Sequence, residues 1–100
     1  MVNENLTLPL DAIGQVCRRY GVHELAVFGS AVRGDFDDES DVDLLVEFEP
    51  LAQIGLFAFV GLQDDLSQII GRKVDLVPKN GLKPLIRDAV LASAEVVYAA

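Results

Sequence analysis

The stretch GSAVRGDFDDESDVDLL, Gly29 to Leu45, decides the fold of this 100-residue chain. Its end reads as a buried strand in which Val42 and Leu44 alternate with two carboxylates, Asp41 and Asp43. Because side chains alternate faces along a strand, both aspartates are expected on one face. Burying an unpaired carboxylate is costly, so something other than the apolar core must satisfy them.

Apolar spacing and turn residues predict the elements on either side of this stretch. Helices are expected at Pro9–Tyr20, Leu51–Ile70 and Pro84 to about Ser93, with a short helical turn at Ala31–Arg33. Strands are expected at Glu24–Phe28, Asp41–Phe48 and Lys73–Val77; Glu95–Tyr98 is either a short edge strand or a continuation of the last helix. GDFDDES reads as an acidic loop and Asn80-Gly81 as a turn. Helices separate most strands, so the predicted class is α/β or α+β, a small sheet with helical cover.

Composition limits what the chain can be. One hundred residues, 51% of them apolar, predict one domain over residues 1–100 with a true core. A net charge of −8 argues against a broad nucleic-acid footprint, yet a nucleotide remains possible if a metal ion supplies positive charge. Cys17 is the single cysteine and reads as a small core residue. Leu51 to Leu62 is too short to span a membrane, which takes about 20 residues, so we expect a cytoplasmic protein.

A third aspartate repeats the pattern of the first two. Asp75 lies inside KVDLV, between Val74 and Leu76. If the two strands are neighbours, three carboxylates converge, and their mutual repulsion would be relieved by a divalent cation such as Mg²⁺. The alternative is that D-x-D is a surface pair and that the third aspartate is an exposed edge residue.

Gly29-Ser30 follows the preceding strand directly. Glycine lets a ligand approach the backbone, and Ser30 offers a hydroxyl and an amide at the start of a helical turn, which suits a triphosphate. The alternative is an ordinary turn with serine as helix cap. Arg33 is expected either to contact phosphate or to pair with an acid of the loop: Asp35, Asp37 or Asp38.

These residues resemble the nucleotidyltransferase superfamily that includes DNA polymerase β. Its signature of Gly-Ser, ten residues and Asp-x-Asp reads here as Gly29-Ser30, Ala31 to Ser40, and Asp41-Val42-Asp43. With GRKVDLV and LKPLIRDAVLASAEVVY, the chain looks like the minimal nucleotidyltransferases of prokaryotes. It departs from many relatives at Ala31, where they carry arginine.

The resemblance implies a small mixed sheet and transfer of a nucleoside monophosphate, AMP from ATP, with release of pyrophosphate. By analogy, Asp41, Asp43 and Asp75 are catalytic and bind two Mg²⁺ ions, while Gly29, Ser30 and Arg33 hold the nucleotide. Minimal members are typically encoded beside a HEPN-domain toxin and act as its antitoxin by attaching AMP to a tyrosine.

Two other functions stay open at this stage. The chain could neutralise its partner by binding alone, or it could transfer a nucleotide to a small molecule with help from another chain. Apolar residues spread around most of the helix predicted at Leu51–Ile70, which indicates either an exposed partner-binding patch or a fully used core. His23 is expected in a loop, and Tyr20 and Tyr98 in the core or at an edge.

Overall fold

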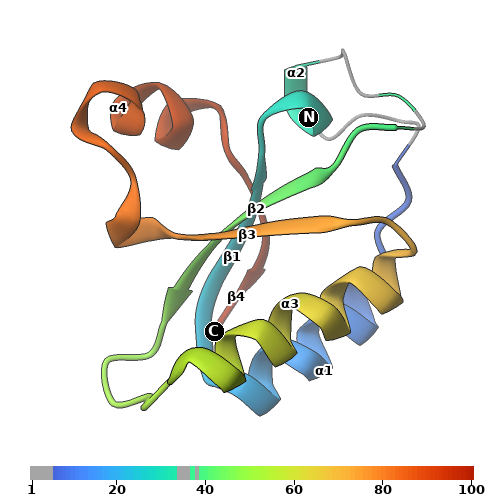
Figure 1. Cartoon of the computed structure of the whole chain (residues 1–100), viewed down its shortest axis with the longest axis vertical. Helices are drawn as coiled ribbons and strands as arrows, with labels where there is room; N and C mark the ends of the chain where they lie inside the picture. The colour runs from blue at the N-terminus through green and yellow to red at the C-terminus, as the bar shows by residue number, and fades with distance from the viewer. Residues whose placement is uncertain (1–5, 34–36, 38) are drawn as a thin grey trace.

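Helices and strands alternate along the chain, and the computed structural model describes residues 6–33, 37 and 39–100. The elements, in chain order, are α1 Leu10–Tyr20, β1 Val22–Phe28, α2 Ser30–Arg33, β2 Val42–Phe48, α3 Leu56–Ile70, β3 Val74–Pro78, the 3₁₀ turn η1 Lys79–Gly81, α4 Pro84–Ser93 and β4 Glu95–Ala99. Figure 1 shows α1 and α3 together on one side of the strands and α4 on the other.

The four strands form one mixed sheet in the order β3-β2-β1-β4. β1 is antiparallel to both β2 and β4, whereas β2 and β3 run parallel. Parallel neighbours need a crossover, and α3 provides it. The predicted class, a small mixed sheet with helices packed against it, is therefore confirmed. The last segment is an edge strand and not a continuation of α4, because Ala94 has an extended backbone (φ −68°, ψ 142°).

One face of the sheet carries the core. α1 and α3 pack against each other and against this face. The largest fully buried side chains come from both helices and from β1 and β2: Ile13, Cys17, Val22, Leu25, Val27, Val42, Leu44, Val46, Leu62 and Leu66. Cys17 is a core residue, as its position in the apolar stripe of α1 predicts.

The helix predicted from Leu51 begins five residues later, so that boundary was wrong. The amide of Ala52 donates to the Glu49 carbonyl in a turn, and Gly55 is extended (φ −85°, ψ −179°) before the first helical bond, Phe59 N–H to the Gly55 carbonyl. Glycine loses more conformational entropy in a helix than other residues, so the helix starts after it and not through it.

The first half of α3 and the segment before it expose large apolar side chains. Leu51 and Phe57 are each 93% exposed, and Leu56 and Val60 are also exposed. Further along, Leu62 and Leu66 are fully buried. The sequence left two alternatives for this segment, an exposed apolar patch or a fully used core. Each holds in part, because the beginning of the segment is exposed and its later half is buried in the core.

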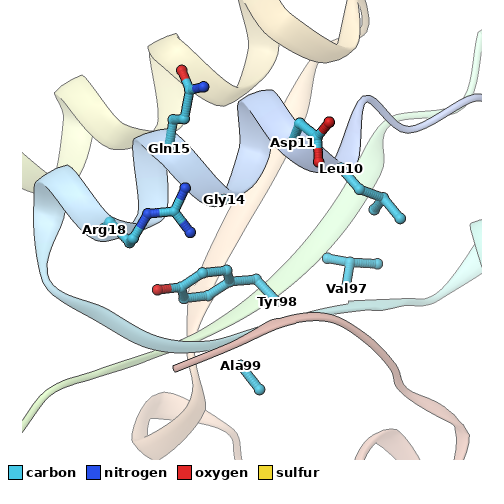
Figure 2. Close-up of a pocket in the computed structure, with 8 residues that line it drawn as sticks. All are labelled: Leu10, Asp11, Gly14, Gln15, Arg18, Val97, Tyr98 and Ala99. Carbon is cyan, nitrogen blue, oxygen red and sulfur yellow. The ribbon is translucent and has the colours of Figure 1, made fainter.

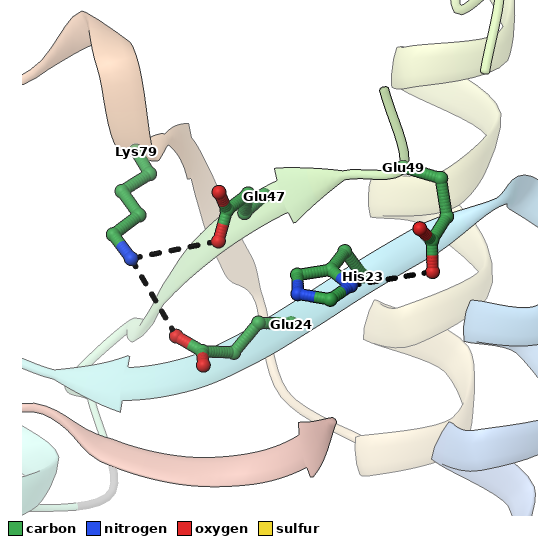
Figure 3. A network of polar contacts seen from close by, with 5 residues as sticks. All are labelled: His23, Glu24, Glu47, Glu49 and Lys79. Carbon is green, nitrogen blue, oxygen red and sulfur yellow. Dashed lines mark hydrogen bonds and ion pairs between the residues drawn. The ribbon is translucent and has the colours of Figure 1, made fainter. Parts of the chain in front are cut away.

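His23 was predicted in a loop and instead lies within β1, because the strand begins two residues earlier than expected. Its Nδ1 lies 3.3 Å from Glu49 Oε1. Figure 3 shows this pair beside two ion pairs of Lys79, whose Nζ lies 3.5 Å from Glu47 Oε1 and 3.8 Å from Glu24 Oε1. Across the described residues, no helix is both long enough and apolar enough to cross a membrane.

Candidate active site

Asp43 and Asp75 lie opposite each other on neighbouring strands. The parallel register of β2 and β3 pairs these two residues directly. The residues that flank each aspartate in its strand are buried against the helices, so the two carboxylates belong to the opposite face of the sheet. Asp43 is half-buried and Asp75 is exposed. The structure therefore brings together two of the three predicted carboxylates.

Gly29 makes room for one of these carboxylates. It follows Phe28, the residue that pairs with Asp43 in the antiparallel register of β1 and β2. Its φ is +72°, in the left-handed region that side chains disfavour, and a Cβ added there would overlap the Asp43 carboxylate. Ser30 comes next and begins α2. The Gly-Ser turn thus adjoins Asp43, one of the two paired carboxylates.

Asp41 is placed differently from the sequence-based expectation. β2 begins at Val42, so Asp41 lies just before the strand and its direction is not set by the pleat. Its Oδ2 lies 3.9 Å from Lys73 Nζ, and both side chains are largely exposed, at 46% and 80%. An exposed pair of this kind is worth between zero and about 1 kcal/mol, so Asp41 is only weakly held there.

Arg72 fastens the loop that leads to Asp41. Its Nη2 donates to the carbonyl of Asp37 and, at 2.8 Å, to the carbonyl of Ser40. Within the loop, Asp37 Oδ1 accepts from the Glu39 amide at 2.9 Å and from the Ser40 hydroxyl at 3.1 Å. These hydrogen bonds, that from Glu39 foremost, hold the pKa of Asp37 below its usual value.

Sequence reasoning missed the role of Arg72, although the residue stands two positions before β3, the strand that carries Asp75. Arg33 ends α2, but its side chain, Gly34–Phe36 and Asp38 lie outside the described residues. The predicted contacts of Arg33 with phosphate or with an acid of the loop therefore stay predictions. The predicted acidic loop is described only at residues 37, 39 and 40.

Two hollows flank Asp43 beneath α4. One, of about 420 Å³, is lined by Phe28, Gly29, Asp43, Ile86, Ala89, Val90 and Ser93. The other, of about 350 Å³, is lined by Phe28, Asp43, Asp75, Val77, Gly81, Leu82, Lys83 and Ile86. Three residues line both hollows, namely Phe28, Asp43 and Ile86. The acidic pair is therefore reachable from two sides, toward Gly29 and toward Asp75.

The donor set suits a hard divalent cation at Asp43 and Asp75. Carboxylate oxygens are the ligands that Mg²⁺ prefers, and Mg²⁺ commonly uses only one or two of them beside water and substrate phosphates. No three acidic, histidine or cysteine side chains of the described residues are already gathered as a metal cluster. The ion pair between Asp41 and Lys73 is weak, so little free energy is lost if Asp41 leaves Lys73 to join Asp43 and Asp75.

A third hollow lies away from the carboxylates. Figure 2 shows it between α1 and β4, with Arg18 reaching over Tyr98. Its volume is about 470 Å³, and its lining includes Asp11, Gln15 and Arg18. None of the residues predicted for the nucleotide or the metal lines it. The volume of a hollow alone therefore does not identify the site, and the predicted site residues lie at the two hollows that flank Asp43.

Comparisons with known proteins show the family to which the chain belongs. The family model for the nucleotidyltransferase domain matches residues 11–97 of the chain. The protein adenylyltransferase MntA of Thermococcus cleftensis is 48% identical over 80 residues, which are 80% of this chain and 77% of that relative.

Solved structures give the same result for the fold. A candidate minimal nucleotidyltransferase is 38% identical, with a TM-score of 0.71 over 85% of each chain. A chain from the complex of a tri-AMPylated HEPN toxin with an MNT antitoxin of Shewanella oneidensis has a TM-score of 0.64 and 17% identity. That match covers 91% of this chain and 70% of the other, and at such low identity it supports the fold alone.

Proposed function

This chain belongs to the nucleotidyltransferase domain family, and we propose that it transfers AMP from ATP to a tyrosine hydroxyl of a HEPN-domain partner as the antitoxin of a toxin–antitoxin pair. AMP as the transferred group is supported by the protein adenylyltransferase that is 48% identical. A HEPN toxin as the acceptor is supported by the AMPylated toxin in the complex that shares this fold.

The observation that carries the proposal is the contact between Gly29 and Asp43. Gly29, which has no side chain, lies against the carboxylate of Asp43, and Asp43 pairs in register with Asp75. Phosphoryl transfer needs a place for the triphosphate beside oxygen ligands for a cation, and this junction offers both. An ordinary surface D-x-D pair needs no such glycine.

Each residue has a role in this proposal. The backbone at Gly29 and the Ser30 amide and hydroxyl bind the β- and γ-phosphates. Asp43, Asp75 and Asp41 would hold two Mg²⁺ ions, and such ions would lower the pKa of the attacking hydroxyl and stabilise the leaving pyrophosphate oxygen. Asp75 also accepts a hydrogen bond from the acceptor hydroxyl and orients it toward the α-phosphorus. The bond from the α-phosphorus to the bridging oxygen breaks as the bond to the tyrosine oxygen forms, the hydroxyl proton passes to the Asp75 carboxylate, and pyrophosphate leaves.

A protein partner also fits the surface of the molecule. The apolar patch made by Leu51, Leu56, Phe57 and Val60 is exposed at the beginning of α3. Contiguous exposed apolar surface often marks a protein-binding site. The patch supports a partner of some kind and does not distinguish catalysis from binding alone.

The test is transfer of label from α-labelled ATP to the HEPN-domain protein encoded beside this chain. Wild type should label the partner in Mg²⁺ and not in EDTA. Asp43→Asn should reduce the rate by at least about 100-fold, because it removes a charge at the reacting phosphate. Asp64→Asn, an exposed acid on α3, is the matched control and should transfer at the wild-type rate.

Absence of label with saturating ATP, despite a stable complex of the two proteins, would contradict the proposal. It would leave neutralisation by binding. Label on a small hydroxyl compound in the absence of the partner would point to a different acceptor. Equal loss in Asp43→Asn and Asp64→Asn would mean that net charge, and not the site, sets the rate.

A further inference from the structure

β4 lies at one edge of the sheet and, in the described part of the chain, pairs with β1 alone. The amide of Ala100 donates to the His23 carbonyl at 2.8 Å, so it points toward β1. Successive amides of a strand point to opposite sides, so the amide of Ala99 points away from the sheet. Ala99 is exposed, and Val96 is 56% exposed. The outer edge of β4 therefore offers backbone groups to which another strand can add.

The hollow between α1 and β4 runs beside this edge (Figure 2). The strand contributes Val97, Tyr98 and Ala99 to its lining, and the helix contributes residues from three successive turns, from Leu10 to Arg18. Extended peptides are commonly bound by addition to an exposed sheet edge, where backbone hydrogen bonds give affinity and pockets for alternate side chains give specificity. A sheet edge with a helix beside it and a hollow of about 470 Å³ between them has this form.

Arg18 gives one end of the hollow a positive charge. Its side chain reaches over Tyr98 (Figure 2), and its guanidinium forms no hydrogen bond or ion pair with the described residues. Gly14 leaves room for it, because a Cβ there would lie 3.3 Å from Arg18 Nη1 and 3.7 Å from Tyr98 Cδ1. Glycine inside a helix costs about 1 kcal/mol relative to alanine, so α1 gives up stability where alanine would crowd this guanidinium. A guanidinium in this position suits a carboxylate.

The other end of the hollow continues into an apolar one. Leu10 and Val97 line both, and the second, of about 330 Å³, is completed by Leu6, Leu8 and Val96. Aliphatic walls of this kind suit an aliphatic side chain. We call the two hollows together the α1–β4 groove. None of its lining residues lines the hollows that flank Asp43, so the groove is separate from the candidate active site.

We propose that the α1–β4 groove binds an extended segment of another protein, which adds to β4 as a fifth strand and places an acidic side chain at Arg18 and an aliphatic one near Leu10. These two residues are eight positions apart on α1, or roughly 12 Å. About four residues of an extended strand cover that distance. Residues four positions apart also share one face of a strand, so both side chains can enter the groove.

The direction of the bound segment follows from the ends of the groove. Antiparallel pairing is slightly more stable than parallel pairing. Arg18 lies over Tyr98, toward the end of β4, and Leu10 lies by Val97 (Figure 2). An antiparallel segment therefore has its acidic residue first and its aliphatic residue four positions later. Asp11, beside Leu10, disfavours a second acid there, and the net charge of −8 disfavours a segment with many acids.

Fluorescence anisotropy with a capped, dye-labelled peptide of the sequence Thr-Glu-Thr-Val-Thr-Leu-Thr tests this proposal. One comparison peptide has Gln in place of Glu, and another has Glu and Leu exchanged. Arg18→Gln removes the proposed partner of the carboxylate. Arg19→Gln is the matched control, because Arg19 is the next residue of α1 and pairs at 3.9 Å with Asp65 instead. Ala99→Pro removes the amide that points outward and leaves the bond of Ala100 to β1 in place.

We expect wild type to bind the Glu peptide at least about tenfold more tightly than either comparison peptide. Arg18→Gln should raise the Kd for the Glu peptide by at least about tenfold and bind the Glu and Gln peptides equally. Ala99→Pro should raise it by at least about fivefold, and Arg19→Gln should stay within about twofold of wild type. All three variants should keep the wild-type circular dichroism spectrum.

Three results would overturn the proposal. The first is no binding of the Glu peptide by wild type at millimolar concentration, and the second is equal binding of the three peptides. The third is binding by folded Arg18→Gln and Ala99→Pro that matches wild type. Sedimentation equilibrium tests a second copy of the chain as the occupant. A wild-type dimer that Ala99→Pro converts to monomer would assign the edge to self-association and would also overturn the proposal.

Discussion

Gly29 and Gly71 have nearly the same backbone conformation and very different surroundings. Their φ angles are +72° and +76°, but an added Cβ would overlap the Asp43 carboxylate at position 29 and meet nothing within 4 Å at position 71. Alanine should therefore cost about 1–2 kcal/mol of stability at Gly71, from backbone strain alone. At Gly29 the same strain should come with displacement of Asp43, and we expect transfer to fall by about 100-fold.

Chemical denaturation and the label-transfer assay, run on both alanine variants, check this prediction. Gly71→Ala should lose stability and keep its transfer rate at a temperature where it is folded. A similar transfer rate in the folded forms of the two variants would show that the room beside Asp43 has no part in the reaction.

Single residues also show which parts of the candidate site the sequence pattern can predict. Asp43 and Asp75 were predictable because both lie inside strands, where alternation fixes the face of a side chain. Asp41 lies one residue before its strand, so the same rule does not apply, and its partner Lys73 comes from a distant part of the chain. The hydrogen bonds of Arg72 to backbone carbonyls leave no pattern in the sequence at all.

Among the elements, the loop before β2 depends on one side chain. Arg72 donates to the carbonyls of Asp37 and Ser40, on either side of the turn that precedes Asp41. Without these bonds the start of β2 is held less firmly relative to β3. Because small displacements of reacting groups are costly, Arg72→Ala should lower the rate of transfer by about tenfold or more. Arg72→Lys should recover only part of it, since lysine lacks the planar fork of donors.

Steady-state transfer rates and melting temperatures together measure this effect. Arg19→Ala serves as control, because Arg19 is exposed and makes a long 3.9 Å ion pair with Asp65 on the helical side. The prediction fails if Arg72→Ala and Arg19→Ala have the same transfer rate, or if Arg72→Lys is fully active.

The element boundaries that the sequence misplaced have a common cause. From Leu51 to Val60 the residues are almost all apolar, so periodicity gives no strong signal for where a helix begins. Gly55, inside that run, marks the true start, but a single glycine is tolerated in many helices. The end at Gly71 was predicted because glycine commonly follows the last turn of a helix, and the structure confirms it, since Gly71 has a positive φ there.

At the scale of the whole molecule, the thiol of Cys17 and the phenol of Tyr20 make the free energy of unfolding sensitive to alkaline pH. Burial raises the pKa of the Cys17 thiol from 9.0 to about 11. The hydrogen bond from Tyr20 to Asp65, together with burial, raises the pKa of the phenol. The unfolded chain loses both protons at lower pH than the folded chain does. The free energy of unfolding should therefore be steady below about pH 9 and fall as the pH rises toward 11.

Urea unfolding at several pH values measures this fall. Cys17 alone should account for roughly 2–3 kcal/mol of it. Cys17→Ala should start from a lower stability and decline less, with the remaining slope due to Tyr20. Parallel pH profiles for wild type and Cys17→Ala would contradict the assigned role of the thiol.

The architecture could be read from the sequence only as far as local signals reach. Strand and helix types follow from periodicity, and the helical stripe of α1 and the alternation of β2 fix which side chains form the core. The strand order and the parallel pairing of β2 with β3 are tertiary choices, and so is the space beneath α4. The sequence predicts α4 as a helix without indicating its packing, and the structure leaves its side chains unburied, with one face lining a hollow beside Asp43.

That open helix has a consequence for how such a protein can change over time. α4 joins the rest of the chain through extended residues at both ends, Lys83 and Ala94, and adds no side chain to the core. Substitutions within it therefore carry little penalty for folding. A ten-residue segment of this kind can differ widely in sequence between relatives while the sheet and its carboxylates stay as they are.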